Sequence, residues 1–396
     1  MRVTQFLDQT QFLTSIGALQ SGIAQTQNQI GSNLQFTTAS ENPTAAGSVN
    51  NYKQALAQSQ QYGTNAISAQ TNLSTEDNAI SQVQTQLQTL RGLALQANSG
   101  TLNNTNRAAI ATQAVQIQNS LLALANTQNG NGEYIFGGFA SQTQPFTLSA
   151  TGAAYNGDQG QRQVQIAAGQ TVADGDNGNT VFTQIKTGNG TFTVTAAAIN
   201  TGSGIVGATT VSNPAAYNGG TYAINFTAPG TYQVLQGVTV VSTGTYTDGG
   251  TIAFNGVQVT LSGQPATGDS FSVAPSSNQS LFTTVQNLVS ALQTGVSSAS
   301  SSTSLNNSIN SAINNIDQAL AQTSNVRASI GGRLNTITTQ QSVAGTQQVQ
   351  LQQSISTLQS LDYASALTTL TQQNTTLSAA LQAYNLTKGL TLFKFF

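Results

Sequence analysis

Both ends of this 396-residue chain carry narrow apolar stripes in which apolar residues recur at alternating steps of four and three. The N-terminal stripe consists of Phe12, Ile16, Leu19, Ile23, Ile30 and Leu34, with Thr26 in the seam. The C-terminal stripe, which follows a phase shift at residues 361–363, consists of Leu370, Leu377, Leu381 and Tyr384. Such a stripe is typical of coiled-coil helices and is buried only against another helix. We therefore expect the two ends to meet each other or neighbouring copies, with an assembly interface at Ile16, Leu19, Ile23, Ile30, Leu370, Leu377 and Leu381.

A long helix is predicted for residues 43–97, with Asn42 as its N-cap and Pro43 at its first position. Its apolar rows are Leu73, Ile80, Leu87 and Ala94, and Ala69, Val83, Leu90 and Ala97, the second interrupted by Glu76. The segment 98–100 ends this helix, with Gly100 as its stop. Residues 110–124 then predict a shorter helix returning antiparallel, and residues 309–337 offer a third helix to the bundle.

Between residues 136 and 280 the pattern changes to alternation with frequent Gly, Thr and Asn, which indicates strands. The clearest signal is a hairpin at residues 252–259, in which Asn255-Gly256 predicts a type I′ turn. We predict an α+β fold, in which long coiled-coil-like helices from both termini form discontinuous helical domains around an inserted antiparallel β domain. The predicted domains are residues 1–42 with 345–396 (terminal coiled coil), 43–135 with 281–344 (helical rod) and 136–280 (β domain).

The composition excludes several classes of function. Charged residues make up 6% of the chain and the net charge is −2, with no run of Lys or Arg, so neither a nucleic-acid interface nor a polybasic membrane patch is expected. The chain has no Cys and no His, which removes thiol nucleophiles, Ser-His pairs and His/Cys zinc sites. No stretch is apolar enough for membrane insertion. We expect no enzyme activity, cofactor or metal, and a surface of uncharged polar residues that suits repetitive assembly.

Several collinear segments resemble the hook-associated protein 3 (hook–filament junction) family of the flagellin superfamily. The helical segments are 40–47, 90–102, 124–127 with 132–138, and 324–334; those of the insert are 155–158, 162–166, 174–178, 181–182 and 268–273. Residues 187–250 show no resemblance, and the ending at residues 393–396 departs from the usual pattern of the family.

The resemblance implies a structural subunit of the bacterial flagellum that forms the junction ring between hook-associated protein 1 and the flagellin filament. Its implied partners are hook-associated protein 1, flagellin, further copies of itself and a flagellar export chaperone. It also implies export without a cleaved signal peptide to an extracellular location. The alternatives are a flagellin-type filament subunit and, in another class, an extracellular carbohydrate-binding β domain on helical stalks, for which the absence of Trp is unfavourable.

Charged and glycine-rich motifs each have a structural alternative to a chemical role. The segment 174–178 suggests a calcium loop but lacks the ligand spacing of an EF-hand, so a turn between strands is favoured. The glycines of residues 130–138 favour a linking loop over a phosphate cradle. Asp158 and Arg162 are a candidate ion pair.

The remaining arginines lie on the predicted helices. The segment 90–93, which contains Arg91, resembles the part of flagellin that innate immune receptors recognise, although a solvated side chain beside the seam is the simpler interpretation. Arg327 and Arg333 are predicted to be inter-helix or inter-subunit partners of acids such as Glu76 and Asp77. Asp362 is predicted to be the N-cap of the last helix.

Overall fold

A computed structural model describes residues 2–389; the C-terminal segment 393–396 lies outside the described residues. The chain divides into two compact units, one built from the residues up to 64 and from 340 onward, the other from residues 65–339. The predicted α+β class is confirmed, since helices from both chain ends flank a central antiparallel β domain. Within the described residues, no helix is both long enough and apolar enough to cross a lipid bilayer. The three-domain division proposed from the sequence stays a prediction.

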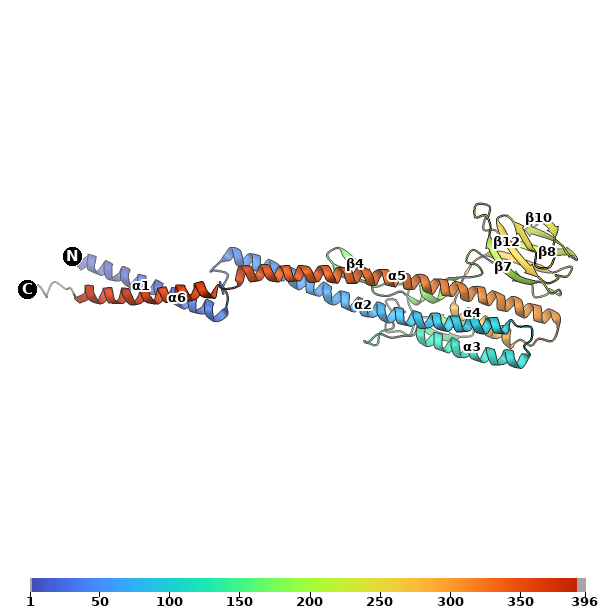
Figure 1. Cartoon of the computed structure of the whole chain (residues 1–396), viewed down its shortest axis with the longest axis horizontal. Coiled ribbons are helices and arrows are strands. Elements are labelled where there is room, and N and C mark those ends of the chain that lie inside the picture. The colour runs from blue at the N-terminus through green and yellow to red at the C-terminus, as the bar shows by residue number, and fades with distance from the viewer. Residues whose placement is uncertain (1, 390–396) are drawn as a thin grey trace, which may run out of the picture. The chain divides into compact units, whose positions relative to one another are not determined.

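The first unit consists of helices joined by short capped breaks. They are α1 (Arg2–Ser32), the start of α2 (Pro43–Ala97), the end of α5 (Ala299–Gln359) and α6 (Tyr363–Gly389). Figure 1 shows α1 and α6 side by side. The chain segment that follows α1 also contacts the end of α5, because Gln35 N donates to Gln359 O at 2.8 Å.

Both helix caps predicted in this unit are confirmed. Asn42 Oδ1 accepts a hydrogen bond from Ala45 N at 3.1 Å, which caps α2 at the predicted residue. Asp362 Oδ1 accepts from Ala364 N at 3.1 Å and Ser365 N at 3.2 Å, which caps α6. Each side chain satisfies backbone N–H groups that have no partner within the helix, so the phase shift at residues 361–363 is a helix break.

The second unit has a helical core formed by α2, α3 (Asn104–Ala125), α4 (Leu281–Gln293) and α5. In Figure 1, α3 runs back along α2 as the predicted hairpin. Both predicted rows of α2 are buried, which confirms the face assigned from the spacing. Gly100 is not the stop that was predicted: α2 ends at Ala97, and Gly100 lies in the following turn without a positive φ.

Short strands after the hairpin pack on this helical core. They are β1 (Phe146–Ser149), β2 (Gly152–Tyr155), β3 (Gln163–Ala167), β4 (Gln170–Ala173), β5 (Ile185–Lys186) and β14 (Asn278–Gln279), with a π-helical turn, η1 (Asn179–Thr183). The rings of Phe146, Phe182 and Phe282 lie within 6.2 Å of one another, centroid to centroid, and join β1, η1 and α4. The first third of the predicted insert therefore belongs to the hydrophobic core of the helices.

The remaining strands form a β domain with its own core. They are β6 (Phe192–Ala196), β7 (Ile205–Val211), β8 (Tyr222–Ala228), β9 (Thr231–Gln236), β10 (Thr239–Thr245), β11 (Thr251–Phe254), β12 (Val257–Ser262) and β13 (Ser270–Pro275). Their antiparallel sheets have the orders β10-β9-β8-β13-β6 and β11-β12-β7. The predicted hairpin is confirmed, because Phe254 pairs with Val257 around Asn255 (φ 39°) and Gly256 (φ 77°), as a type I′ turn requires.

Candidate assembly surface and polar cluster

The paired terminal helices form the candidate assembly surface of the first unit. The rings of Phe12 on α1 and Tyr384 on α6 stack with centroids 4.6 Å apart, and Gln9 Nε2 donates to the Tyr384 hydroxyl at 3.3 Å. Further along the pair, the hydroxyl of buried Thr26 donates to Gln373 Oε1 at 3.2 Å. The predicted pairing of the two ends is therefore confirmed within a single subunit.

This pairing covers the predicted interface residues only in part. Those that are half-buried are Ile16, Leu19, Ile23, Ile30, Leu370 and Leu377. Leu381 is 43% exposed. An assembly role for these seven residues stays a prediction.

Other apolar side chains of the same helices are more exposed, and the sequence analysis missed them as interface residues. They are Phe6, Leu7, Leu13, Leu367 and Leu386, with Phe6 at 73% exposed. Among them only Leu367 fits the four-three spacing, three residues before Leu370, and the others are signalled only by the excess of large apolar residues over what one seam needs. Contiguous exposed apolar side chains are typical of surfaces that bind another chain.

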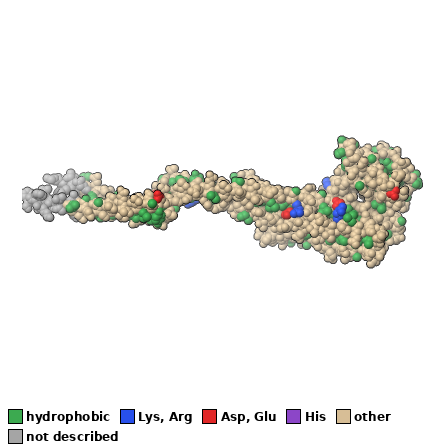
Figure 2. Space-filling view, in the orientation of Figure 1, with side chains coloured by type: hydrophobic (Ala, Val, Ile, Leu, Met, Phe, Trp, Pro, Cys, Tyr) green, Lys and Arg blue, Asp and Glu red, His purple; other side chains and the backbone are tan. Residues whose placement is uncertain are grey.

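Ion pairs link the two long helices of the second unit. Arg91 Nε on α2 donates to Asp317 Oδ1 on α5 at 2.6 Å, and Arg327 Nε on α5 donates to Asp77 Oδ1 on α2 at 2.8 Å. The Arg91 side chain stays 40% exposed beside the seam, as the simpler interpretation expected, although it is also paired with Asp317. The predicted inter-helix role of Arg327 is confirmed. Figure 2 shows charged side chains in only a few small groups on an otherwise uncharged face.

Arg333 pairs with Asp176 instead of Glu76. Glu76 lies fully buried on α2, where its Oε1 accepts from Asp176 N at 3.2 Å and its Oε2 has no partner among the described residues. Burial is the main cause that raises the pKa of Glu76 well above its ordinary value, and the nearby Asp176 carboxylate raises this pKa further. Arg333 opposes the shift. The sequence contains a signal for this buried acid, because Glu76 occupies a heptad position that is otherwise apolar.

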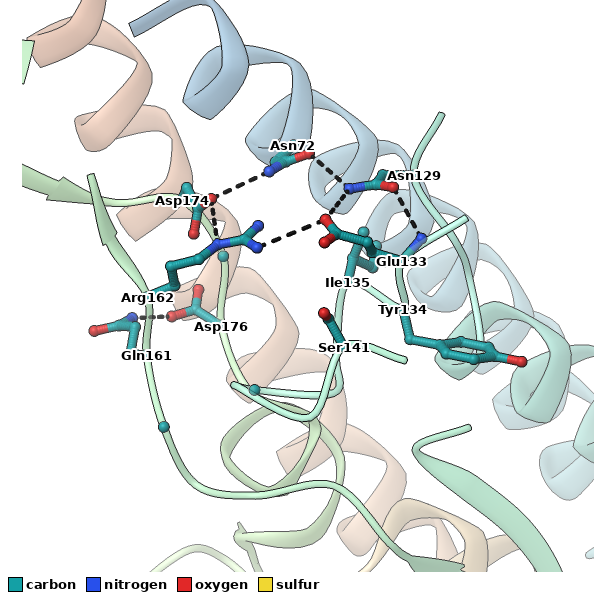
Figure 3. Close-up of a pocket in the computed structure, with 13 residues that line it drawn as sticks. Asn72, Asn129, Glu133, Tyr134, Ile135, Ser141, Gln161, Arg162, Asp174 and Asp176 are labelled. Atoms are coloured by element: carbon teal, nitrogen blue, oxygen red, sulfur yellow. Dashed lines mark hydrogen bonds and ion pairs between the residues drawn. The ribbon is translucent and has the colours of Figure 1, made fainter. Parts of the chain in front are cut away.

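Arg162 is the centre of a polar cluster that joins the loop after the hairpin to α2 (Figure 3). Its Nε donates to Asp174 Oδ2 at 2.8 Å, and its Nη1 lies 3.6 Å from Glu133 Oε2. Asn72 on α2 donates to the same Asp174 oxygen at 3.2 Å and accepts from Asn129 at 3.2 Å. Each acid of the cluster is thus held by donors from a different chain segment, which fixes the path of the loops over the helices.

The predicted pair of Asp158 and Arg162 is not formed. Asp158 Oδ1 accepts from Phe139 N at 2.9 Å and Gly160 N at 2.6 Å, and these hydrogen bonds lower the pKa of the Asp158 carboxyl. Asp158 therefore orders the turn around residues 137–160, in which Gly138 has the positive φ of 68° that favours glycine.

The cluster has the composition of a structural joint. Its cavity measures about 30 Å³, which is room for a water molecule but not for an organic substrate. The described residues contain no group of three acids that is placed to hold a metal ion. Residues 174–178 connect β4 to η1, so they form a connection as favoured, although it leads to a π-helical turn and not to a strand.

Comparisons with known proteins first define the class of protein to which the chain belongs. Residues 4–141 match the bacterial flagellin N-terminal helical region, and residues 195–275 match the D2-like domain of flagellar hook-associated protein 1. The second match covers much of the segment 187–250, for which the sequence analysis found no resemblance. Paired terminal helices, a helical rod and a β domain of this kind define a flagellin-like structural protein.

Individual relatives narrow this class to one family. Flagellar hook-associated protein 3 of Salmonella typhimurium is 32% identical over 185 residues, which cover 47% of this chain and 58% of that protein. A crystal structure of Xanthomonas campestris FlgL is 34% identical with a TM-score of 0.73, covering 77% of this chain and 99% of that one. The flagellar junction protein FlgL from Legionella pneumophila is 29% identical with a TM-score of 0.72, covering 79% and 100%. The chain belongs to the flagellar hook-associated protein 3 family.

Proposed function

We propose that the chain is a structural, non-catalytic subunit of the junction between hook-associated protein 1 and the flagellin filament. The observation that carries the proposal is the apolar surface left on α1 and α6 after they have paired, with Phe6, Leu13 and Leu386 exposed. Burial of this surface against neighbouring copies would release roughly 25 cal/mol per Å², which favours assembly over the free subunit.

The proposed neighbours are different proteins on the two faces of a ring. Relatives named as junction and hook-associated proteins support this arrangement, as does the likeness of the β domain to a domain of hook-associated protein 1. A subunit whose two axial faces fit unlike proteins forms a single layer, because it does not stack on further copies of itself. We further propose export to the cell exterior without a cleaved signal peptide, with the help of a chaperone.

Deletion of the gene tests this proposal. We expect cells that keep their hooks and release flagellin into the medium without attached filaments. Expression of the unaltered chain should restore filaments. A Phe6→Ser/Leu13→Ser variant should not, whereas the control variant Gln11→Ser/Gln20→Ser, at exposed polar positions of the same helix, should. Filaments that remain attached in the deletion strain would refute the junction role.

A polymerisation assay separates the junction subunit from a flagellin. The purified chain should not form long filaments when it is seeded with fragments of its own assemblies, because a junction subunit needs unlike partners. Growth of long filaments from the purified chain alone would favour the flagellin alternative.

A further inference from the structure

Amide side chains connect the β domain to the helices of the second unit. The apolar core of the helices and that of the β domain have no residue in common. The segments that lead into and out of the β domain form a narrow two-stranded ribbon, which pairs at β5 and β14 and continues through backbone hydrogen bonds of Thr187 with Ser277 and of Thr191 with Ser276. This narrow ribbon leaves contacts made by α5 to hold the β domain against the helices.

Asn307 on α5 binds the free edge of β7. Val206 N donates to Asn307 Oδ1 at 2.8 Å, and Asn307 Nδ2 donates to Gly204 O at 3.0 Å. Backbone groups of alternate residues point to the same edge of a strand, so one amide occupies the position of a neighbouring strand. β7 is an outer strand of its sheet, and the edge would otherwise present unpaired hydrogen-bonding groups.

Two further asparagines of α5 extend this contact. Asn310 Nδ2 donates to Val206 O at 2.9 Å, and its Oδ1 accepts from Asn98 of α2 at 3.0 Å. Asn315 Oδ1 accepts from Gly188 N, in the segment that leads to β6, at 2.8 Å. These three asparagines are spaced at three and five residues along α5, and each binds a backbone group of the β domain or of its connection.

A polar groove of about 430 Å³ lies beside these contacts, between β6, α4 and α5. Its lining carries no charged side chain and is rich in hydroxyl and amide groups, among them Thr195, Asn287, Ser304 and Ser311. Because this contact buries little apolar surface, replacing its hydrogen bonds by hydrogen bonds to water has a small net cost in free energy.

We propose that Asn307, Asn310 and Asn315 form a releasable latch, through which the β domain docks on α5 and leaves it without unfolding. Closed, the latch caps the β7 edge at Gly204 and Val206. Open, it lets the β domain adjust its orientation to a neighbouring chain and exposes that edge to an extended strand. The proposal concerns this domain contact and does not depend on the junction role.

Distance measurements by electron spin resonance test the latch. Because the chain has no Cys, cysteines introduced at exposed Val238 and Asn119 carry the only spin labels. The unaltered latch should give one main distance, and the Asn307→Ala/Asn310→Ala/Asn315→Ala variant a distribution about twofold broader. The control Asn306→Ala/Asn314→Ala, on the same helix outside the latch, should keep the main distance. An unchanged distribution in the triple variant would overturn the proposal.

Hydrogen exchange distinguishes undocking from unfolding. In the triple variant the amides of Gly188 and Val206 should exchange about tenfold faster or more, while those of β8 and β13 keep their protection. Loss of protection throughout β8 and β13 would show that the asparagines hold the fold of the β domain itself, and this result would also overturn the proposal.

Discussion

Two arginine–aspartate pairs of the second unit differ in burial and should differ in their contribution to stability. The side chains of Arg91 and Asp317 are 40% and 41% exposed, whereas those of Arg333 and Asp176 are 14% and 13% exposed. An exposed pair contributes about 0.2–1 kcal/mol, because water and salt screen it. Removal of one partner from a buried pair costs about 3–5 kcal/mol, because the other charge remains desolvated.

Arg333→Met should therefore destabilise the second unit by about 3 kcal/mol, at the low end of that range because Gln161 still donates to Asp176 at 2.7 Å. The matched variant Arg91→Met should lose less than about 1 kcal/mol. Urea unfolding followed by circular dichroism measures both losses, as the shift in midpoint multiplied by a common slope. Equal losses for the two variants, or a smaller loss for Arg333→Met, would refute the reasoning from burial.

Three further predictions concern the core, the buried acid and the chain ends. Leu87→Asp should lower the thermal midpoint strongly, at a cost of several kcal/mol, whereas exposed Gln88→Asp should leave it nearly unchanged; equal midpoints would show that the wrong face was assigned. The raised pKa of Glu76 means that the folded state binds a proton more tightly than the unfolded state, so this group's contribution to stability falls as pH rises from about 4.5 towards the folded-state pKa. Glu76→Gln should flatten that part of the stability–pH curve, and an unaltered slope would contradict the assignment. In a verified monomer, amides up to residue 42 and beyond 345 should exchange quickly, because their stripes are only partly covered; slow exchange throughout both ends would exclude this account.

Local signals in the sequence were sufficient for much of the fold. Asn42 and Asp362 cap helices where their side chains predicted it, because a cap depends on neighbouring residues only. The hairpin at Asn255-Gly256 depends likewise on local backbone conformation. These features were predictable without knowledge of tertiary structure.

Features that depend on distant residues were not predictable in the same way. Arg162 has Asp158 four residues away and binds Asp174 instead, because the β3–β4 hairpin returns the chain to that point. The joining of Phe146 and Phe282 likewise requires the path of the whole insert. At the candidate assembly surface, the spacing identified the helices and their seam. Phe6 and Leu386 could be identified as exposed apolar residues only from the structure, which shows the side of each helix that its partner covers.

Four of the ten basic side chains of this chain, those of Arg91, Arg162, Arg327 and Arg333, are neutralised by acids of the same subunit. The distance over which salt screens charge falls from roughly 30 Å at 0.01 M to 3 Å at 1 M. Contacts made by uncharged amide, hydroxyl and apolar groups offer little for dissolved ions to screen. A structure assembled from such subunits should hold together nearly equally well in dilute and concentrated salt, whereas one joined by surface ion pairs would weaken as the ionic strength of its surroundings rose.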